Sequence, residues 1–190
     1  MSSRASARPK CCVIDAPLIT TPRLALRPHR MDDMEAFWAF YQTPCAEFVG
    51  APKTRTQMFF GLSSEIVSWG WMGHGAWAID TAEGDFIGQI AITQPPHFPE
   101  REIGWTLFAP AQGKGYATEA ALVALDWAWE QGIDTLVSYI DPDNVRSIAL
   151  AKRLGATHDP DAALPDGETL RETLVFRHRP DSDGNPEAYA

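Results

Sequence analysis

The chain has 190 residues, of which 45% are hydrophobic and 22% are charged, a balance typical of a globular protein that forms one domain. Acidic residues outnumber basic ones by 25 to 16, and the excess lies in the C-terminal half. Nucleic-acid binding needs clustered lysine and arginine. The charge therefore argues against a nucleic-acid partner and is compatible with a cationic one.

Neither a membrane span nor a disulfide framework is expected. No apolar run is long enough to cross a bilayer, and the N-terminal residues lack the apolar stretch of a secretory signal. The three cysteines, Cys11, Cys12 and Cys45, fit neither disulfide nor zinc-ligand spacing. We expect a cytoplasmic protein with no membrane partner and no metal.

The two ends have the composition of tails. A flexible N-terminal tail is predicted over residues 1–17, which begin with small and basic side chains. A second tail is predicted over residues 180–190, which are rich in Pro, Gly and Asp. One domain is predicted between them, over residues 18–179, with no linker and no internal repeat.

The first half of this domain predicts strands and helices from its hydrophobic periodicity. Alternation predicts a strand over residues 23–28. Start signals and apolar residues at helical spacing predict two helices, one opened by Asp32 with Glu35 and one opened by Thr54 and ended by Gly70. Three strands are predicted next, over residues 75–80, 85–92 and 101–108.

The second half alternates helices and strands. A helix is predicted from about Gly115 to Glu130, then a buried strand over 134–140. A helix from about Asn144 to Leu154 and a last strand over 172–178 follow. This order predicts an α/β domain with a mixed sheet, antiparallel in its first part.

The most informative segment is the glycine-rich turn Gln112–Ala117, which leads from a strand directly into a helix. Free backbone N–H groups and the helix dipole at such a start favour an anion such as a diphosphate. Lys114 adds a positive charge, but because Gly115 follows it the segment is not a P-loop. The dinucleotide fingerprint that begins at Gly113 fails at its sixth position, Thr118.

The pattern Q/R-x-x-G-x-G/A is satisfied in full by Gln112–Ala117 and resembles the phosphate turn of the GNAT superfamily of acyl-CoA-dependent N-acyltransferases. Residues 18–28, 102–107 and 144–156 resemble further segments of its branch typified by ribosomal-protein N-terminal acetyltransferases, in order and with the family's spacing. The resemblance covers roughly residues 18–158. It implies a GNAT fold, with a mixed central sheet of about six to seven strands flanked by about four helices.

The resemblance also implies acetyl-CoA as cosubstrate and direct transfer of an acetyl group to a primary amine, either a protein N-terminus or a small molecule. We expect the enzyme to be a monomer or a homodimer. In the family, the CoA diphosphate lies on the glycine turn and the pantetheine arm pairs with the end of the preceding strand. The expected CoA contacts are therefore Leu107, Phe108, Ala109, Gln112, Gly113, Lys114, Gly115, Tyr116, Ala117, Thr118, Asn144 and Ser147.

Asn144 and Ser147 stand three residues apart at the start of a predicted helix. By resemblance, Asn144 would hydrogen-bond the pantetheine, and Ser147 would lie near the thiol as its acid or donor. A simple capping role for Asn144 is the alternative. Many family members place a tyrosine where Ser147 falls.

Glu102 is the candidate base that would deprotonate the acceptor, because it lies on the strand leading to the thioester. A surface carboxylate is the alternative interpretation of Glu102. His74 and His97 are weaker candidates for the base. The acceptor pocket could be lined by three tryptophans, which at such positions also suit a core: Trp69, Trp71 and Trp77.

A covalent route is not expected, because no cysteine is placed against a histidine as a nucleophile. The rival interpretation from another class of protein is a non-catalytic module that binds CoA as a sensor.

Overall fold

A single mixed sheet organises the computed structural model, which describes residues 16–50, 52 and 54–180. Within those residues eight strands lie in the order β1-β2-β3-β4-β5-β6-β8-β7. The strands are β1 (Ile19–Thr20), β2 (Leu24–Arg27), β3 (Ala76–Thr81), β4 (Phe86–Thr93), β5 (Glu102–Leu107), β6 (Leu136–Ile140), β7 (Thr157–His158) and β8 (Leu174–His178). The pairing of β5 with β6 is parallel, and the other pairings are antiparallel.

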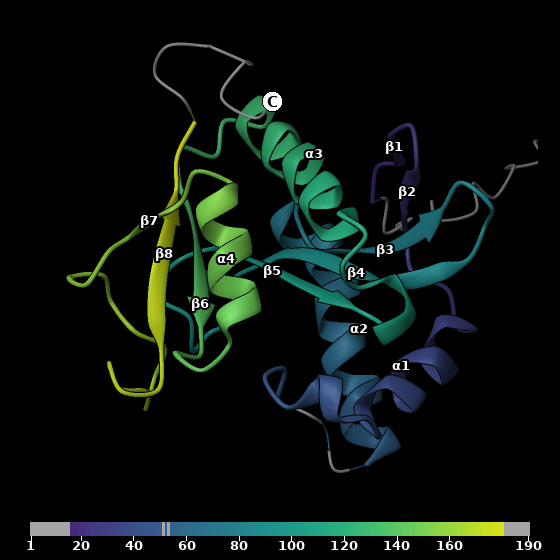
Figure 1. Cartoon of the computed structure of the whole chain (residues 1–190), viewed down its shortest axis with the longest axis horizontal. Coiled ribbons are helices and arrows are strands. Elements are labelled where there is room, and N and C mark those ends of the chain that lie inside the picture. Colours follow the sequence, from purple (N-terminus) through teal and green to yellow (C-terminus); the bar gives the residue numbers. More distant parts are fainter. Residues whose placement is uncertain (1–15, 51, 53, 181–190) are drawn as a thin grey trace, which may run out of the picture.

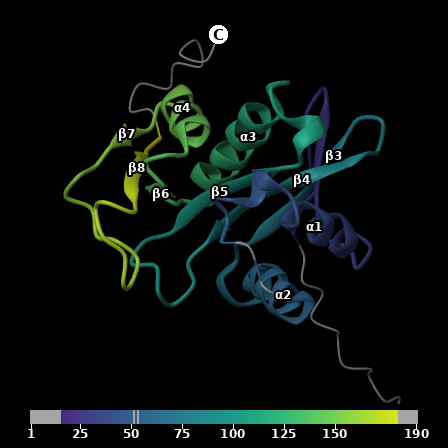
Figure 2. The same cartoon turned by 60° about the horizontal axis from the view of Figure 1, so that its bottom comes forward.

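Helices cover both faces of the sheet (Figures 1 and 2). On one face lie α1 (Asp33–Tyr41) and α2 (Arg55–Met72), and on the other lie α3 (Tyr116–Glu130) and α4 (Val145–Arg153). Two short 3₁₀ turns, η1 (Pro44–Ala46) and η2 (Ala109–Ala111), join these elements. The α/β fold expected from the sequence is confirmed.

The sheet has more strands than the six to seven expected. The additional pairings, β1 and β7, are each two residues long. Two residues are too few for the alternation that identifies a strand in a sequence. The first helix begins where the signal at Asp32 predicts it, with Asp32 as the N-cap residue, although the Asp32 side chain makes no capping hydrogen bond. The second helix ends at Gly73, whose φ of +74° forms its C-cap, rather than at Gly70.

Arg27 binds two carboxylates and thereby anchors α1 to the sheet. Its guanidinium donates to both oxygens of Asp33 at 2.8 Å and to Asp80 at 2.5 and 2.8 Å. Burial alone would raise the pKa of Asp33, but the hydrogen bonds from Arg27, His29 and the backbone of Arg30 hold it well below its usual value.

The core on the α3 side is built from small helix residues and large strand residues. A stripe of buried alanines lets α3 lie close to the sheet: Ala120, Ala121, Ala124 and Ala128. A tryptophan cluster of Trp69, Trp77 and Trp127 extends this core, with ring centroids 4.5–5.4 Å apart. Trp71, by contrast, is 85% exposed.

The strands β5 and β6 separate soon after they meet. Their register consists of the single pair Glu102–Val137, and the Val137 N–H donates to the Arg101 carbonyl at 2.9 Å. One step further, the Tyr139 N–H donates at 3.4 Å to the carboxylate of Glu102 instead of to a backbone carbonyl. A gap therefore opens between the two strands, with Glu102 at its narrow end.

On its other edge β5 pairs regularly with β4, from Glu102 opposite Thr93 to Leu107 opposite Gly88. No register shift interrupts this ladder. A register shift occurs instead between β3 and β4, at Ile79 and Asp80.

The predicted tails fall largely outside the described residues, as do Cys11 and Cys12. Ala16 and Pro17 are described and are packed on the core: Ala16 is buried, and the Pro17 carbonyl accepts a hydrogen bond from the Trp77 indole at 2.9 Å. Among the described residues, no helix combines the length and apolar character needed to span a membrane.

Candidate active site

A cavity of about 1340 Å³ borders the end of β5 and lies between α3, α4 and η1. Most of the residues predicted to contact CoA line it: Leu107, Ala109, Gln112, Gly113, Gly115, Tyr116, Ala117, Thr118, Asn144 and Ser147. The structure thus brings together, in one cavity, segments that are far apart in the sequence.

Two predicted contacts lie elsewhere. Phe108 turns toward α1 and packs against Phe37, Phe40 and Phe86, with ring centroids 5.2–5.5 Å apart. The exposed Lys114 is not among the lining residues, although its backbone carbonyl helps to hold the turn. Residue type alone could not show these directions.

The helix α3 begins without a side-chain cap. Its N-cap is Gly115, with φ of +80°. The helices α2 and α4, by contrast, are capped at 3.1 Å by Thr54 and Asn144. The first N–H groups of α3 thus lack a capping side chain and lie at the wall of the large cavity. Such a helix start attracts an anion.

Arg23 of the loop before β2 holds this helix start in place. Its side chain donates to Glu119 at 2.6 Å and to the Lys114 carbonyl at 3.0 Å, and its guanidinium lies 4.9 Å from the Tyr116 ring. The strand β2 and the glycine turn are therefore fixed to each other. This role of Arg23 was not predicted from the sequence, because nothing local to residue 23 indicates a partner almost one hundred residues away.

Two further arginines of α4 line the same cavity. Arg146 donates to the Gln112 side chain at 2.6 Å, and Arg153 donates to Thr118 at 3.3 Å. Together with Arg23 they place three guanidinium groups around the uncapped start of α3, in a protein of net charge −9. The seven-residue spacing of Arg146 and Arg153 puts both on one helix face and could have indicated them.

Asn144 and Ser147 lie at the start of α4, as predicted. The Asn144 Oδ1 accepts from the Ser147 N–H at 3.1 Å, so this side chain caps the helix. The Ser147 hydroxyl accepts from the Trp105 indole at 3.2 Å. Both residues also line the large cavity, so the cap and the predicted ligand contact are compatible.

The end of β5 leaves backbone groups free to face this cavity. The Phe108 N–H donates to Ile87 at 2.9 Å, so the alternation of an antiparallel ladder turns the N–H groups of Leu107 and Trp105 toward the gap. The Leu107 carbonyl on that edge accepts from the Gln112 side chain at 2.9 Å. An extended ligand in the gap would meet this edge as an added strand does.

The Glu102 side chain points to the face of the sheet that α1 and α2 cover, whereas α3 and α4 and the large cavity lie on the other face. A Cβ added at Gly104 would stand 3.6 Å from the Glu102 carboxyl carbon, so this side chain extends over Gly104. Burial raises the pKa of Glu102 to about 8, and the nearby Glu65 and Glu168 contribute in the same direction. A carboxyl group with such a pKa suits proton transfer near neutral pH.

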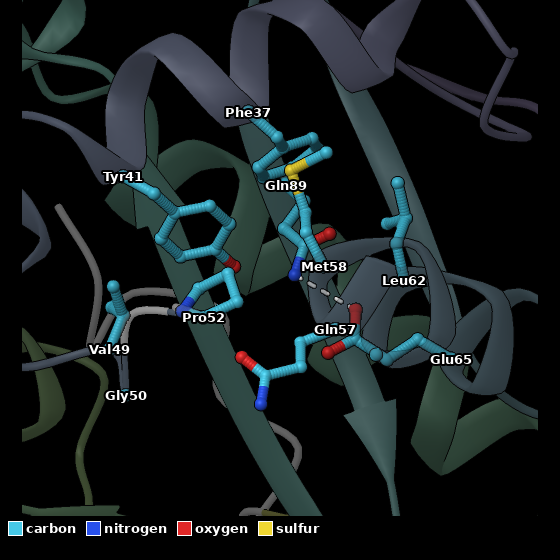
Figure 3. A pocket seen from close by; sticks show the side chains of 11 residues that line it. Phe37, Tyr41, Val49, Gly50, Pro52, Gln57, Met58, Leu62, Glu65 and Gln89 are labelled. Carbon is cyan, nitrogen blue, oxygen red and sulfur yellow. Dashed lines mark hydrogen bonds between the residues drawn. The ribbon is translucent and has the colours of Figure 1, made fainter. Parts of the chain in front are cut away.

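A second cavity, of about 500 Å³, lies on this face between α1, α2 and β4 (Figure 3). Its polar side chains include Tyr41, Glu65 and Gln89, and the Gln89 amide donates to Glu65 at 2.9 Å. None of the three was predicted from the sequence. A signal was present for Glu65, which is the one charged residue after Arg55 in α2.

The predicted alternatives for the base have other surroundings. His74 is buried, and its Nδ1 lies 2.8 Å from the Ile92 carbonyl, while burial lowers its pKa. His97 is exposed in the loop before β5. Trp69 and Trp77 belong to the core and Trp71 to the surface, so none of the three lines either cavity.

Comparisons with known proteins agree with this geometry. The family model described as "Acetyltransferase (GNAT) domain" matches residues 23–157. The crystal structure of an acetyltransferase from Agrobacterium tumefaciens str. C58 is 40% identical, covers 92% of this chain and 100% of its own, and superposes with a TM-score of 0.82.

Two further matches are more distant. RimL, a ribosomal L7/L12 alpha-N-protein acetyltransferase solved with coenzyme A, shares the fold at 17% identity and a TM-score of 0.70, covering 88% of this chain and all of its own. The uncharacterized protein YkkB of Bacillus subtilis (strain 168) is 36% identical over 81 residues, which are 41% of this chain and 47% of YkkB. The chain spans about half the length of the curated relatives it matches. The family match covers most of the chain, including the glycine turn and both strands at the gap, and this protein therefore belongs to the GNAT acetyltransferase family.

Proposed function

We propose that this protein is an acetyl-CoA-dependent N-acetyltransferase that transfers the acetyl group directly to a primary amine. The observation that carries the proposal is the uncapped start of α3, which lies at the wall of the large cavity with Arg23, Arg146 and Arg153 around it. Helix N–H groups and guanidinium groups together form a site for phosphates.

The chain's own residues suit each part of the cosubstrate. The glycine turn and the three arginines would hold the phosphates, and the Asn144 amide and the free edge of β5 would hold the pantetheine arm. When bound, acetyl-CoA would supply an acetyl group activated as a thioester. The N–H groups of Trp105 and Leu107 would donate to a developing negative charge at the carbonyl oxygen.

Two side chains would move protons. Glu102 would take a proton from the acceptor ammonium, directly or through a water molecule, because an ammonium cannot attack a carbonyl carbon. Ser147 would donate to the sulfur atom: its oxygen accepts from Trp105, and its own proton is left to donate. No residue of the enzyme would carry the acetyl group.

Calorimetric titration with CoA tests the cosubstrate site. In Gly115→Glu a carboxylate would stand at the diphosphate position, so we expect at least a roughly ten-fold weaker Kd, a loss of about 1.4 kcal/mol. Gly132→Glu is the matched control, because Gly132 has a similar φ of +77° at the other end of α3 and a Cβ added there would meet no atom within 4 Å.

Circular dichroism would check that both variants are folded. If folded Gly115→Glu bound CoA as tightly as the parent, the proposed site would be wrong. If CoA bound to the parent but acetyl-CoA released no thiol with any primary amine or peptide N-terminus, the protein would be a CoA sensor rather than an enzyme.

A further inference from the structure

We propose that the cavity between α1, α2 and β4 binds the acceptor as a small primary ammonium with an apolar body, and that Glu65 and Gln89 are its polar contacts. This inference rests on the proposed function, because it concerns the substrate of the same reaction.

The Glu65–Gln89 contact leaves hydrogen-bond acceptors for a cation. Gln89 donates through its Nε2 to the Glu65 carboxylate at 2.9 Å, so its Oε1 atom must point elsewhere. That oxygen is buried and has no hydrogen-bond partner among the described residues. A buried acceptor without a partner is costly. An ammonium group in the cavity could donate to the Glu65 carboxylate, and donation to Gln89 Oε1 as well would require the side chains that cover this oxygen to move aside.

The remaining wall combines apolar side chains with the polar ends of Tyr41 and Gln57. Phe37 and Tyr41 project from α1, and Met58 and Leu62 project from α2 (Figure 3). No lysine or arginine is among the described lining residues. A volume of about 500 Å³ is that of a small-molecule site.

The charges around Glu65 also favour a cation. Burial raises the pKa of Glu65 to about 7, although the hydrogen bond from Gln89 opposes this shift. The pKa of Tyr41, raised to about 12 mainly by burial, is increased further by Glu65. Glu102 of β5 likewise interacts unfavourably with Glu65. These neighbours from α1, β4 and β5 include no cation, so an incoming ammonium would stabilise the ionised carboxylate.

The second cavity adjoins the one proposed for acetyl-CoA. Val49, in the loop after η1, lines both cavities. Gln89 is paired in register with Thr106, which lines the larger cavity. An amine held at Gln89 would thus lie beside the strand that borders the acetyl-CoA cavity.

Calorimetric titration with 2-phenylethylamine, in the absence of acetyl-CoA, tests this inference without depending on turnover. We expect Glu65→Gln to weaken Kd by at least about ten-fold, because a hydrogen bond to a charged group is lost. Gln89→Met keeps the shape, removes the acceptor Oε1 and should weaken Kd in the same direction. Glu83→Gln, in the exposed turn between β3 and β4, is the control and should bind as the parent does.

Affinity for the amine should also fall as the pH drops below about 7, because Glu65 becomes protonated. The uncharged analogue 2-phenylethanol should bind at least about ten-fold more weakly than the amine. Unchanged Kd in both the Glu65 and Gln89 variants, no binding of the amine by the parent, or tighter binding of a peptide N-terminus would each overturn the inference.

The two proposals fail separately. Glu65-dependent binding of the amine without any acetyl transfer would contradict the proposed function and leave this acceptor site standing. Acetyl transfer to 2-phenylethylamine with the same KM in parent and Glu65→Gln would contradict the acceptor site and leave the proposed function standing.

Discussion

Ser147 of α4 and Trp105 of β5 are joined by a hydrogen bond: the Ser147 Oγ atom accepts from the Trp105 indole N–H at 3.2 Å. The contact fixes the position of the hydroxyl relative to β5. The Ser147 hydroxyl proton is left available for donation to another group, because the oxygen atom is the acceptor in the bond from Trp105.

Ser147→Ala should therefore lower kcat more than it changes the KM for acetyl-CoA. A donor to the departing sulfur acts mainly in the transition state. We expect a fall in kcat of roughly ten-fold to 100-fold, at or below the lower end for acid catalysis, because a thiolate leaves readily. Asn144 caps α4 through the backbone N–H of residue 147, so the helix start should survive the change. Unchanged kcat, with chemistry rate-limiting, would make Ser147 a structural residue.

Glu102→Gln should lower kcat/KM by about 10²–10⁴-fold, as is typical for loss of a general base. In the parent, the rate should rise as the pH increases through about 8, because the raised pKa of Glu102 keeps the carboxyl group protonated below that value. In the variant, kcat/KM should no longer rise with the pKa of Glu102 and should instead rise with the pKa of the amine itself. A pH–rate profile measures both effects. Nearly full activity with the parent's profile would assign deprotonation to water or to another group.

Asp33→Asn should destabilise the fold by about 3 kcal/mol, the lower end for breaking a buried ion pair, because Asp80 still pairs with Arg27. The native pKa of Asp33 lies below its value in the unfolded chain. Its contribution is thus present above a pH of about 4 and is lost as the pH falls further. Urea unfolding should show a large difference at neutral pH and a smaller one in acid. Glu35→Gln, at a fully exposed carboxylate of the same helix, is the control and should leave the stability close to that of the parent.

Gly88→Ala should be costly because the backbones of β4 and β5 touch there. Gly88 has φ of +148°, and a Cβ would stand 2.1 Å from the Thr106 carbonyl oxygen. We expect a loss of about 2–4 kcal/mol and weaker CoA binding, since Thr106 and Leu107 line the large cavity. Gly84→Ala has a positive φ but open space around it and should cost about 1 kcal/mol. Equal losses in thermal unfolding would contradict this packing argument.

The sequence predicted those parts of the molecule that depend on local patterns. The glycine turn was identified because Gly113 and Gly115 stand between a strand and a helix, and in the structure both have positive φ. The helix start at Asn144 was identified for the same reason, because a capping side chain acts on a residue three positions away.

Contacts between distant segments were not predictable in this way. The Arg23–Glu119 and Glu65–Gln89 pairs form only once helices have packed on the sheet. The direction of Phe108, away from the large cavity, depends on aromatic neighbours supplied by α1 and β4. No local sequence pattern predicts the separation of β5 from β6, because this separation depends on how whole strands pair.

The most direct test of acetyl transfer measures the free CoA thiol and the acetylated amine in the same reaction of the full-length protein, with acetyl-CoA and 2-phenylethylamine. We expect equal amounts of the two products at every time point and no thiol release when the amine is omitted. Intact-mass spectrometry should find the protein itself unmodified. Thiol release without acetylated amine, no release with any primary amine, or an acetylated enzyme that passes its group to the amine would contradict direct transfer.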